Sequence, residues 1–221
     1  MLDIAVSTSL LLLLMPFFVV IAAIIKLESR GGLFYPAERV GRHGETFAML
    51  KFRKMTGDAT GSSLTAVDDP RFTRIGSILS RSKIDELPQL WNVLRGQMSL
   101  VGPRPEAPEF VERRRAEYAR ILTVRPGMTG FSQLAFAEEI AILDPDNRVG
   151  HYETAILPQK LALDSMYVQR HSVRDDVRVL WWTLFAVVFR RHVAVHRSTA
   201  KLNIRRRPVV RGHAERERRP A

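Results

Sequence analysis

An uncharged apolar segment near the start constrains this 221-residue chain more than any other feature. Residues 4–25 form a run of 22 residues without a charged side chain, long enough to cross the ~30 Å core of a bilayer as a helix. A signal peptide fits poorly, because no basic residue precedes the run and no clear small-x-small cleavage site follows it. Lys26 and Arg30 come directly after it, so we expect the rest of the chain on the cytoplasmic side.

Pro16 lies near the middle of this segment and leaves two arrangements open. A proline inside a helix removes a hydrogen bond and bends the helix axis. The segment could therefore re-enter the membrane as a hairpin, if protein contacts satisfied the freed backbone groups. A plain single-pass anchor is the simpler alternative, and the sequence alone does not choose between them.

Two adjacent carboxylates, Asp85 and Glu86, stand at a junction between two predicted helices. Apolar residues at helical spacing predict one helix over about 72–84 and a second from near residue 87 to Gly96. Pro88 cannot donate a backbone hydrogen bond, and it disfavours helical geometry at Leu87. The carboxylates would lie at the positive N-terminal end of the second helix. Read locally, they are either ordinary helix caps or reactive acids beside an anion site.

Several basic residues are candidates for contacting an anion. Lys51, Arg53 and Lys54 lie on or just after a predicted strand, and an arginine fork matches phosphate oxygens, although a solvated strand end has the same pattern. Arg104 is held between two prolines and Arg125 precedes a Pro-Gly turn, so each could be a fixed anion contact or part of a rigid connector. The glycine-rich nucleotide loops and the His-Glu-x-x-His metal motif are absent from the sequence.

The remaining pattern predicts a mostly α fold with a small β element. The predicted elements are strands at 34–39 and 46–52 around a turn at 41–44, a loop at 56–70, an extended segment at 103–108, helices at 109–122, 137–143 and 151–170, and a turn-rich loop at 125–130. Residues 177–189 are apolar and aromatic but too short to span a bilayer. They predict either a helix at the membrane interface or a buried core helix.

The basic character of the chain is concentrated at its C-terminus. Residues 190–221 hold eleven Lys or Arg and two Asp or Glu, so +9 of the formal net charge of +11 lies there. We expect a disordered tail attracted to anionic lipid. The other 189 residues carry only +2 and no recognised motif, so no nucleic-acid partner is predicted. The predicted organisation is a membrane-anchoring helix at 1–30, a cytoplasmic domain at 31–189 and this tail.

Several ordered motifs resemble the bacterial sugar transferases, the monotopic phosphoglycosyltransferases. These enzymes move a sugar phosphate from a nucleotide diphosphosugar to polyprenol phosphate. The resemblance covers about residues 1–185 and is strongest in DELPQLWNVL at 85–94. The other matching segments are 38–41, 51–53, 69–76, 98–105 and 125–130, with Tyr167, Ser172 and Asp176 near the end.

The resemblance implies roles for these residues. Asp85 would be the nucleophile that attacks the sugar-linked phosphorus and releases UMP, and Glu86 would bind Mg²⁺ or assist proton transfer. The basic residues would bind substrate: Arg104 at the nucleotide side, Lys51, Arg53 and Arg81 at phosphates, and Arg125 as a further contact.

The resemblance also implies partners and a location. The expected partners are a UDP-sugar, undecaprenyl phosphate, membrane lipid and, as a further candidate, a second copy of the chain. The expected location is the bacterial inner membrane, with a re-entrant helix broken at Pro16 and the catalytic domain facing the cytoplasm. The product would start an exopolysaccharide, capsule, O-antigen or glycoconjugate. The alternative is a non-catalytic, membrane-tethered polyanion-binding or assembly protein.

The chain departs from the family pattern at several places. Met15 stands where the family has a serine before Pro16, which weakens the expectation of a hairpin. Lys54 replaces a small hydroxyl residue, and residues 131–136 differ from the usual end of the Arg-Pro-Gly loop. The choice of sugar therefore stays open.

Overall fold

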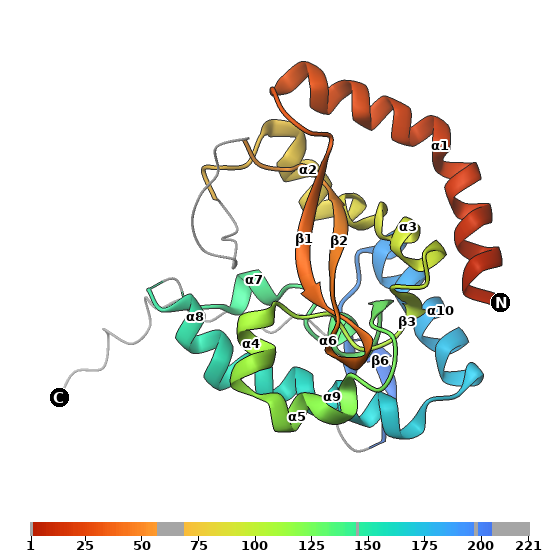
Figure 1. Ribbon diagram of the computed structural model, residues 1–221, viewed down its shortest axis with the longest axis vertical. Helices are drawn as coiled ribbons and strands as arrows, with labels where there is room; N and C mark the ends of the chain where they lie inside the picture. The colour runs from red at the N-terminus through yellow and green to blue at the C-terminus, as the bar shows by residue number, and fades with distance from the viewer. Residues whose placement is uncertain (1, 57–68, 145, 197–198, 205–221) are drawn as a thin grey trace.

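The protein is described by a computed structural model that covers residues 2–56, 69–144, 146–196 and 199–204 (Figure 1). Over these ranges it is mainly helical and contains three small two-stranded sheets, which confirms the predicted mostly α class. The α-helices are α1 Leu2–Glu28, α2 Arg74–Ser82, α3 Gln89–Leu94, α4 Pro108–Arg113, α5 Arg115–Ile121, α6 Phe131–Ala135, α7 Glu139–Ile142, α8 Arg148–His151, α9 Leu157–Arg170 and α10 Val173–Phe189. The strands are β1 Phe34–Val40, β2 Thr46–Phe52, β3 Ser99–Val101, β4 Gly127–Thr129, β5 Val193–Val195 and β6 Leu202–Ile204.

The predicted hairpin at the centre of the fold is confirmed. β1 and β2 pair antiparallel from Phe34 opposite Phe52 to Val40 opposite Thr46, and the turn between them contains Gly44 at a φ of 83°. The inward residues of the two strands contribute to all three apolar clusters of the described core. The hairpin therefore ties the clusters together, and it carries Lys51 at the end of β2.

The predicted pair of helices around the two carboxylates is also present. Thr73 caps α2 by accepting a 3.0 Å hydrogen bond from the Gly76 backbone N–H. α2 ends at Lys83, which adopts a left-handed conformation with φ of 61°, and the chain continues through the 3-10 turn η2, Ile84–Glu86, into α3. The predicted non-helical geometry at Leu87 is wrong, because the turn runs directly into α3 and keeps Leu87 at φ −57° and ψ −32°.

Part of the predicted 125–130 loop is a strand. β4 pairs parallel with β3, so the segment before Pro103 and the segment after Arg125 are held side by side. A side-chain Cβ on Gly127 would lie 2.1 Å from the backbone nitrogen of Gly102, so only glycine permits this approach. Turn residues mark this segment in the sequence, but no local pattern indicates its partner strand.

The predicted single helix at 109–122 is wrong. The chain breaks at Arg114, with φ of −129° and ψ of 38°, into α4 and α5. The break lets Phe110 of α4 and Tyr118 of α5 enter the same apolar cluster, while the Arg114 guanidinium donates to the Glu153 carbonyl. The helices predicted at 137–143 and 151–170 are confirmed in part by α7, and by the π-helical turn η3, Tyr152–Ile156, followed by α9. α6 was not predicted.

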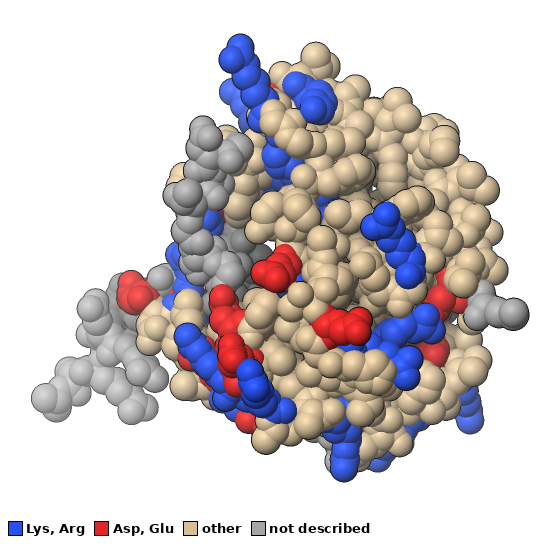
Figure 2. All heavy atoms as spheres, in the orientation of Figure 1, with Lys and Arg blue, Asp and Glu red and all other residues tan. Residues whose placement is uncertain are grey.

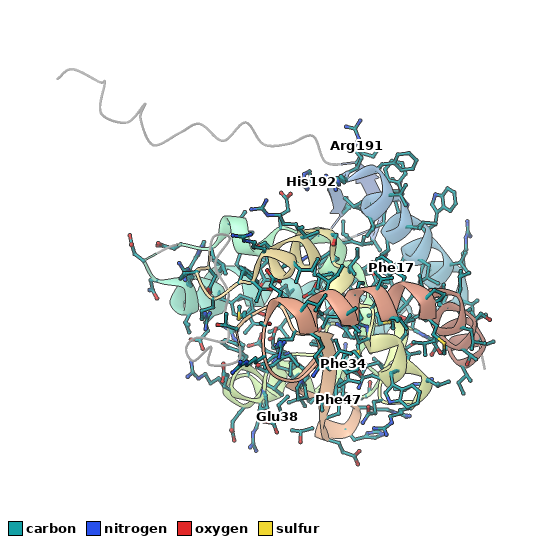
Figure 3. All side chains as sticks on the ribbon, turned by 90° about the horizontal axis from the view of Figure 1, so that it is seen from above. Phe17, Phe34, Glu38, Phe47, Arg191 and His192 are labelled. Atoms are coloured by element: carbon teal, nitrogen blue, oxygen red, sulfur yellow. The ribbon has the colours of Figure 1, made fainter. Side chains whose placement is uncertain are left out.

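α1 is a continuous helix that passes through Pro16 and changes direction near its middle (Figure 1). Its mean hydropathy reaches 2.8, and it is the one helix in the described ranges that is long and apolar enough to cross a membrane. Most of its apolar side chains are exposed, and Figure 2 shows few charged side chains over it. Viewed from above, it lies across the domain with Phe17 along its length (Figure 3).

Both ends of α1 are fastened to the domain. Near its N-terminus, the Asp3 carboxylate accepts hydrogen bonds from the Ser99 hydroxyl at 2.8 Å and the Leu100 N–H at 3.3 Å. At its C-terminus, the Glu28 carboxylate accepts the first backbone N–H groups of α2, with 2.7 Å to Arg74. An acidic side chain at a helix N-terminus is favourably placed, so this second contact also caps α2.

Helix α10 and strands β5 and β6 decide two predictions about the C-terminal part of the chain. Val179 is the only buried residue among the described residues of α10, and Trp181 is 67 % exposed, so the buried-core alternative for 177–189 is wrong. The expectation of disorder from residue 190 onward is wrong for β5 and β6, which form a hairpin whose Val193 and Leu202 pack into the main core. Residues 205–221, with both arginine clusters of the predicted tail, lie outside the described residues.

Candidate active site

A cavity of about 280 Å³ opens beside the junction of α2 and α3. Its walls come from β2, η2, the segment after β3, the β4–α6 connection, α7, α9 and α10. The segments that meet here are far apart in the sequence, so the cavity exists only in the folded chain. Its charged lining residues are Arg39, Lys51, Lys54, Lys83, Asp85, Glu86, Arg104, Glu106, Glu139 and Lys160.

Asp85 is the most deeply placed acid of this cavity. It is 2 % exposed, and its Oδ2 lies 3.1 Å from the Lys54 ammonium group. Its Oδ1 is buried and has no hydrogen-bond partner among the described residues. Burying a carboxylate oxygen without a partner costs free energy, so an oxygen left free in a cavity is a candidate for contact with a ligand.

Glu86 is held by two cations from different parts of the chain. Its Oε1 accepts hydrogen bonds from Lys51 at 3.0 Å and from Arg104 at 3.1 Å. Burial raises the pKa of Glu86, but the charges of Lys51, Arg104 and Lys83 outweigh burial and hold this pKa well below its usual range. The Glu86 carboxylate therefore stays ionised at neutral pH and contributes stability that is lost only as the pH falls through the lowered pKa.

A second group of charges lines the same cavity. The Lys160 ammonium group is 3.0 Å from Glu139 and 3.5 Å from Glu106, and it donates to the Tyr152 hydroxyl at 2.8 Å. The Tyr152 hydroxyl in turn donates to Glu106. Arg104 interacts with Glu86 and with both of these glutamates, so it lies between the two groups. The part of the cavity at Glu106 and Glu139 is its more acidic end, and the part at Lys51 and Lys54 is its more basic end.

The positive end is suited to phosphate chemistry. A carboxylate is a known nucleophile towards phosphoryl groups, and one oxygen of Asp85 is not engaged. The surrounding cations would stabilise negative charge that builds up on a phosphoryl group. A search for related sequences agrees with this chemistry, because the family model described as bacterial sugar transferase matches residues 1–190.

The chain belongs to the bacterial sugar transferase family. The predicted family, and with it the prediction of a phosphoglycosyltransferase, is confirmed.

Relatives of this sugar transferase carry names of the same kind. The chain is 36 % identical over 199 residues to the undecaprenyl-phosphate glucose phosphotransferase of Komagataeibacter xylinus, covering 86 % of this chain and 36 % of that protein. It is 37 % identical over 197 residues to the exopolysaccharide production protein PSS of Rhizobium leguminosarum bv. phaseoli, covering 85 % and 94 %. It is 37 % identical over 188 residues to the UDP-glucose:undecaprenyl-phosphate glucose-1-phosphate transferase of Caulobacter vibrioides, covering 83 % and 67 %. The chain thus spans only about a third of the Komagataeibacter protein.

The structure brings four of the predicted site residues of the sugar transferase together and leaves three elsewhere. Asp85, Glu86, Lys51 and Arg104 line the cavity. The lining residues of the cavity do not include the other three predicted substrate contacts, Arg53, Arg81 and Arg125.

Each of these three residues lies in a different setting. The Arg53 guanidinium is buried against the C-terminal end of α1 and donates to the carbonyls of Ser29 at 2.7 Å and Arg30 at 2.9 Å. Arg81 is exposed on α2, and Arg125 faces Asp3 at 3.6 Å. Lys51 and Arg53 are two residues apart, a spacing that would place both side chains on one face if the strand continued. β2 ends at Phe52, however, so the alternation does not extend to Arg53.

Sequence reasoning missed several lining residues. Lys54 was grouped with Lys51 and Arg53 and noted as a departure from the family, but its ion pair with Asp85 was not predicted. Glu106, Tyr152 and Lys160 had no local signal, because a hydrogen bond and an ion pair join η3 and α9 to the segment before α4. The extended Pro-Arg-Pro segment was the one available signal, since Glu106 follows it directly.

Replacing Arg53 by methionine tests its position. We expect Arg53→Met to lower the free energy of unfolding by about 2 kcal/mol and the thermal midpoint by about 4–8 °C, because the carbonyls at the end of α1 lose a charged donor. Thermal unfolding in detergent measures this, with the exposed Arg120→Met as control. Transferase activity measured below the midpoint should survive. An unchanged midpoint with lost activity would support the role in substrate binding that the sequence suggested.

Asp164 on α9 provides a test by pH. It is buried, and burial raises the pKa of Asp164 from 3.8 to about 7, although hydrogen bonds from Ser132 and the Arg104 N–H oppose this. Between pH 4 and 7 the folded state keeps a proton that the unfolded state has lost, so stability falls as the pH rises, by up to ~4 kcal/mol. We expect Asp164→Asn to lessen the fall in thermal midpoint between pH 5 and 8 by about 5 °C or more. The exposed Asp146→Asn should leave it unchanged, and an equal fall in both variants would contradict the assignment.

Proposed function

We propose that this protein transfers a sugar 1-phosphate from a UDP-sugar to undecaprenyl phosphate through a covalent intermediate on Asp85. The observation that carries the proposal is the unpartnered Oδ1 of this buried aspartate. It lies in a cavity that is also lined by Lys51, Lys54 and Arg104. The names of the relatives support the donor, the acceptor and an initiating role in exopolysaccharide synthesis. The non-catalytic alternative is not favoured, since it leaves this arrangement of charges unexplained.

The proposed reaction has two displacements at one phosphorus. An oxygen of Asp85 attacks the sugar-linked phosphorus, the bond from that phosphorus to the bridging oxygen breaks, and UMP leaves with the bonding electrons. An oxygen of undecaprenyl phosphate then attacks the same phosphorus and the Asp85 carboxylate departs. Lys54 holds Asp85 in place, while Lys51 and Arg104 orient Glu86 and supply positive charge near the diphosphate.

Mg²⁺ is part of the proposal. The described residues contain no group of three or more Asp, Glu, His or Cys side chains that could hold a metal. Glu86 nevertheless fits the one or two carboxylates that Mg²⁺ takes from a protein when substrate phosphates supply other ligands. Glu86 would hold the ion, and the unpartnered oxygen of Asp85 would remain available for attack on the phosphorus. When bound, Mg²⁺ would offset the charge of the diphosphate.

We also propose that α1 re-enters the membrane and does not span it. A spanning helix separates its ends by the ~30 Å core of the bilayer, but a single domain contacts α1 at both Asp3 and Glu28. The bend at Pro16 and the exposed apolar side chains between the two contacts support this arrangement. The cytoplasmic domain, the inner membrane and contact of α10 with the interface belong to the same proposal.

The variant Asp85→Asn tests whether Asp85 is the nucleophile. We expect Asp85→Asn to lower UMP release by at least about 1,000-fold, because the amide cannot form the phosphoryl ester. Wild type incubated with donor and Mg²⁺ but without acceptor should gain the mass of one sugar phosphate, and the variant should not. Asp146→Asn is the control. Turnover of Asp85→Asn at the wild-type rate would exclude the role of Asp85 as nucleophile.

The topology of α1 is open to direct labelling, because the chain contains no cysteine. Leu2→Cys and Arg30→Cys place single thiols on exposed residues at the two ends of the apolar helix. For a re-entrant helix, both thiols should resist a membrane-impermeant maleimide in intact spheroplasts and react in inverted membrane vesicles. Labelling of Leu2→Cys in intact spheroplasts, with Arg30→Cys protected, would instead show a spanning helix.

A further inference from the structure

We propose that the acidic end of the cavity, formed by Glu106 and Glu139, binds hydroxyl groups of the donor's sugar and so contributes to the choice of sugar. This inference rests on the proposed function. It assigns the half of the cavity that the transfer chemistry does not use. Glu106 and Glu139 both line the cavity that also contains Asp85.

The two carboxylates are held in fixed positions by buried partners. Lys160 is 4 % exposed, and it lies between Glu139 at 3.0 Å and Glu106 at 3.5 Å. The Tyr152 hydroxyl donates to Glu106 and accepts from Lys160 at 2.8 Å. Side chains fixed in this way present their remaining oxygen lone pairs in a defined geometry, as discrimination between sugar epimers requires.

The two carboxylates lie among several cations and remain open to the cavity. Both converge on the buried Lys160, and Arg39 and Arg104, which also line the cavity, add positive charge near them. The side chains of Glu106 and Glu139 remain 12 % and 20 % exposed, so both are accessible from the cavity. Their remaining oxygen lone pairs can therefore accept hydrogen bonds from a ligand.

The distribution of charge in the cavity indicates which part of the donor would lie near Glu106 and Glu139. Two carboxylates repel a diphosphate, whereas Lys51 and Lys54, which pair with Glu86 and Asp85, attract it. The unpartnered Oδ1 of Asp85 shows where a phosphorus atom would be approached. Carboxylates are strong acceptors for hydroxyl groups, so the uncharged, hydroxyl-bearing ring next to that phosphorus fits the acidic end.

The adjacent residues Glu138 and Glu139 allow the same substitution to be compared inside and outside the proposed subsite. Glu139→Gln removes one carboxylate of the proposed subsite, and the control Glu138→Gln changes the adjacent exposed residue, whose carboxylate lies 3.4 Å from His192 outside the cavity. The full-length protein is assayed for UMP release with a panel of epimeric UDP-hexoses, undecaprenyl phosphate and Mg²⁺. Inhibition by UMP is measured in parallel, and Glu106→Gln is tested in the same way.

The inference expects a selective loss. In Glu139→Gln, kcat/KM for the preferred donor should fall by about 10-fold or more, and the ratio of kcat/KM between that donor and its epimers should shrink, while the UMP inhibition constant stays within about twofold. Glu138→Gln should match wild type. Equal losses for all donors, or unchanged selectivity in both Glu139→Gln and Glu106→Gln, would overturn the subsite and leave the transferase function intact. Failure of wild type to release UMP from any donor would overturn the proposed function and this inference with it.

Discussion

The charge on two adjacent carboxylates, the buried Asp85 and the partly buried Glu86, is the constraint on which the site depends. Removing the charge of a carboxylate from water costs free energy unless positive charge lies nearby. The cations come from three directions: Lys54 after β2, Lys51 within β2 and Arg104 after β3. Each must be placed by its own element, so the hairpin, the α2–α3 junction and the β3–β4 pair have to assemble together before the carboxylates are stable.

The backbone around the carboxylates follows from the same requirement. Lys83 in the left-handed region turns the chain sharply after α2, so that Asp85 faces inward within a short 3-10 turn. The close approach of Gly102 and Gly127 fixes the strand that leads into Arg104. Asp164 accepts the Arg104 backbone N–H from below this segment. None of these local features alone positions a site residue, but together they set the direction of the Arg104 guanidinium group.

Sequence patterns predicted what is local and missed what depends on distant partners. The apolar segment, the β1–β2 hairpin and the junction at Asp85 each have signals within a few residues, namely hydrophobic period, turn residues and Pro88. The ion pair of Lys54 with Asp85 has no such signal. The same holds for the group around Lys160, whose two carboxylate partners, Glu139 and Glu106, are 21 or more residues away in the chain. Arg53 shows the reverse error: its position in a basic cluster suggested phosphate binding, whereas burial directs its guanidinium to the end of α1.

The attachment of α1 connects the membrane to the chemistry. The C-terminal end of α1 caps α2 through Glu28, and its N-terminal end binds β3 through Asp3. α1 therefore contacts both the element before the α2–α3 junction and the element after it. With one fastened end, the domain could swing about the anchor. With two, its orientation relative to the apolar face of α1 is fixed. A lipid-linked phosphate has its charge at the headgroup level and its chain in the bilayer. Under the proposed topology, a helix attached to the domain at both ends holds the cavity at a constant depth relative to that charge. Weakening either contact should therefore impair use of the lipid acceptor before it impairs attack on the soluble donor.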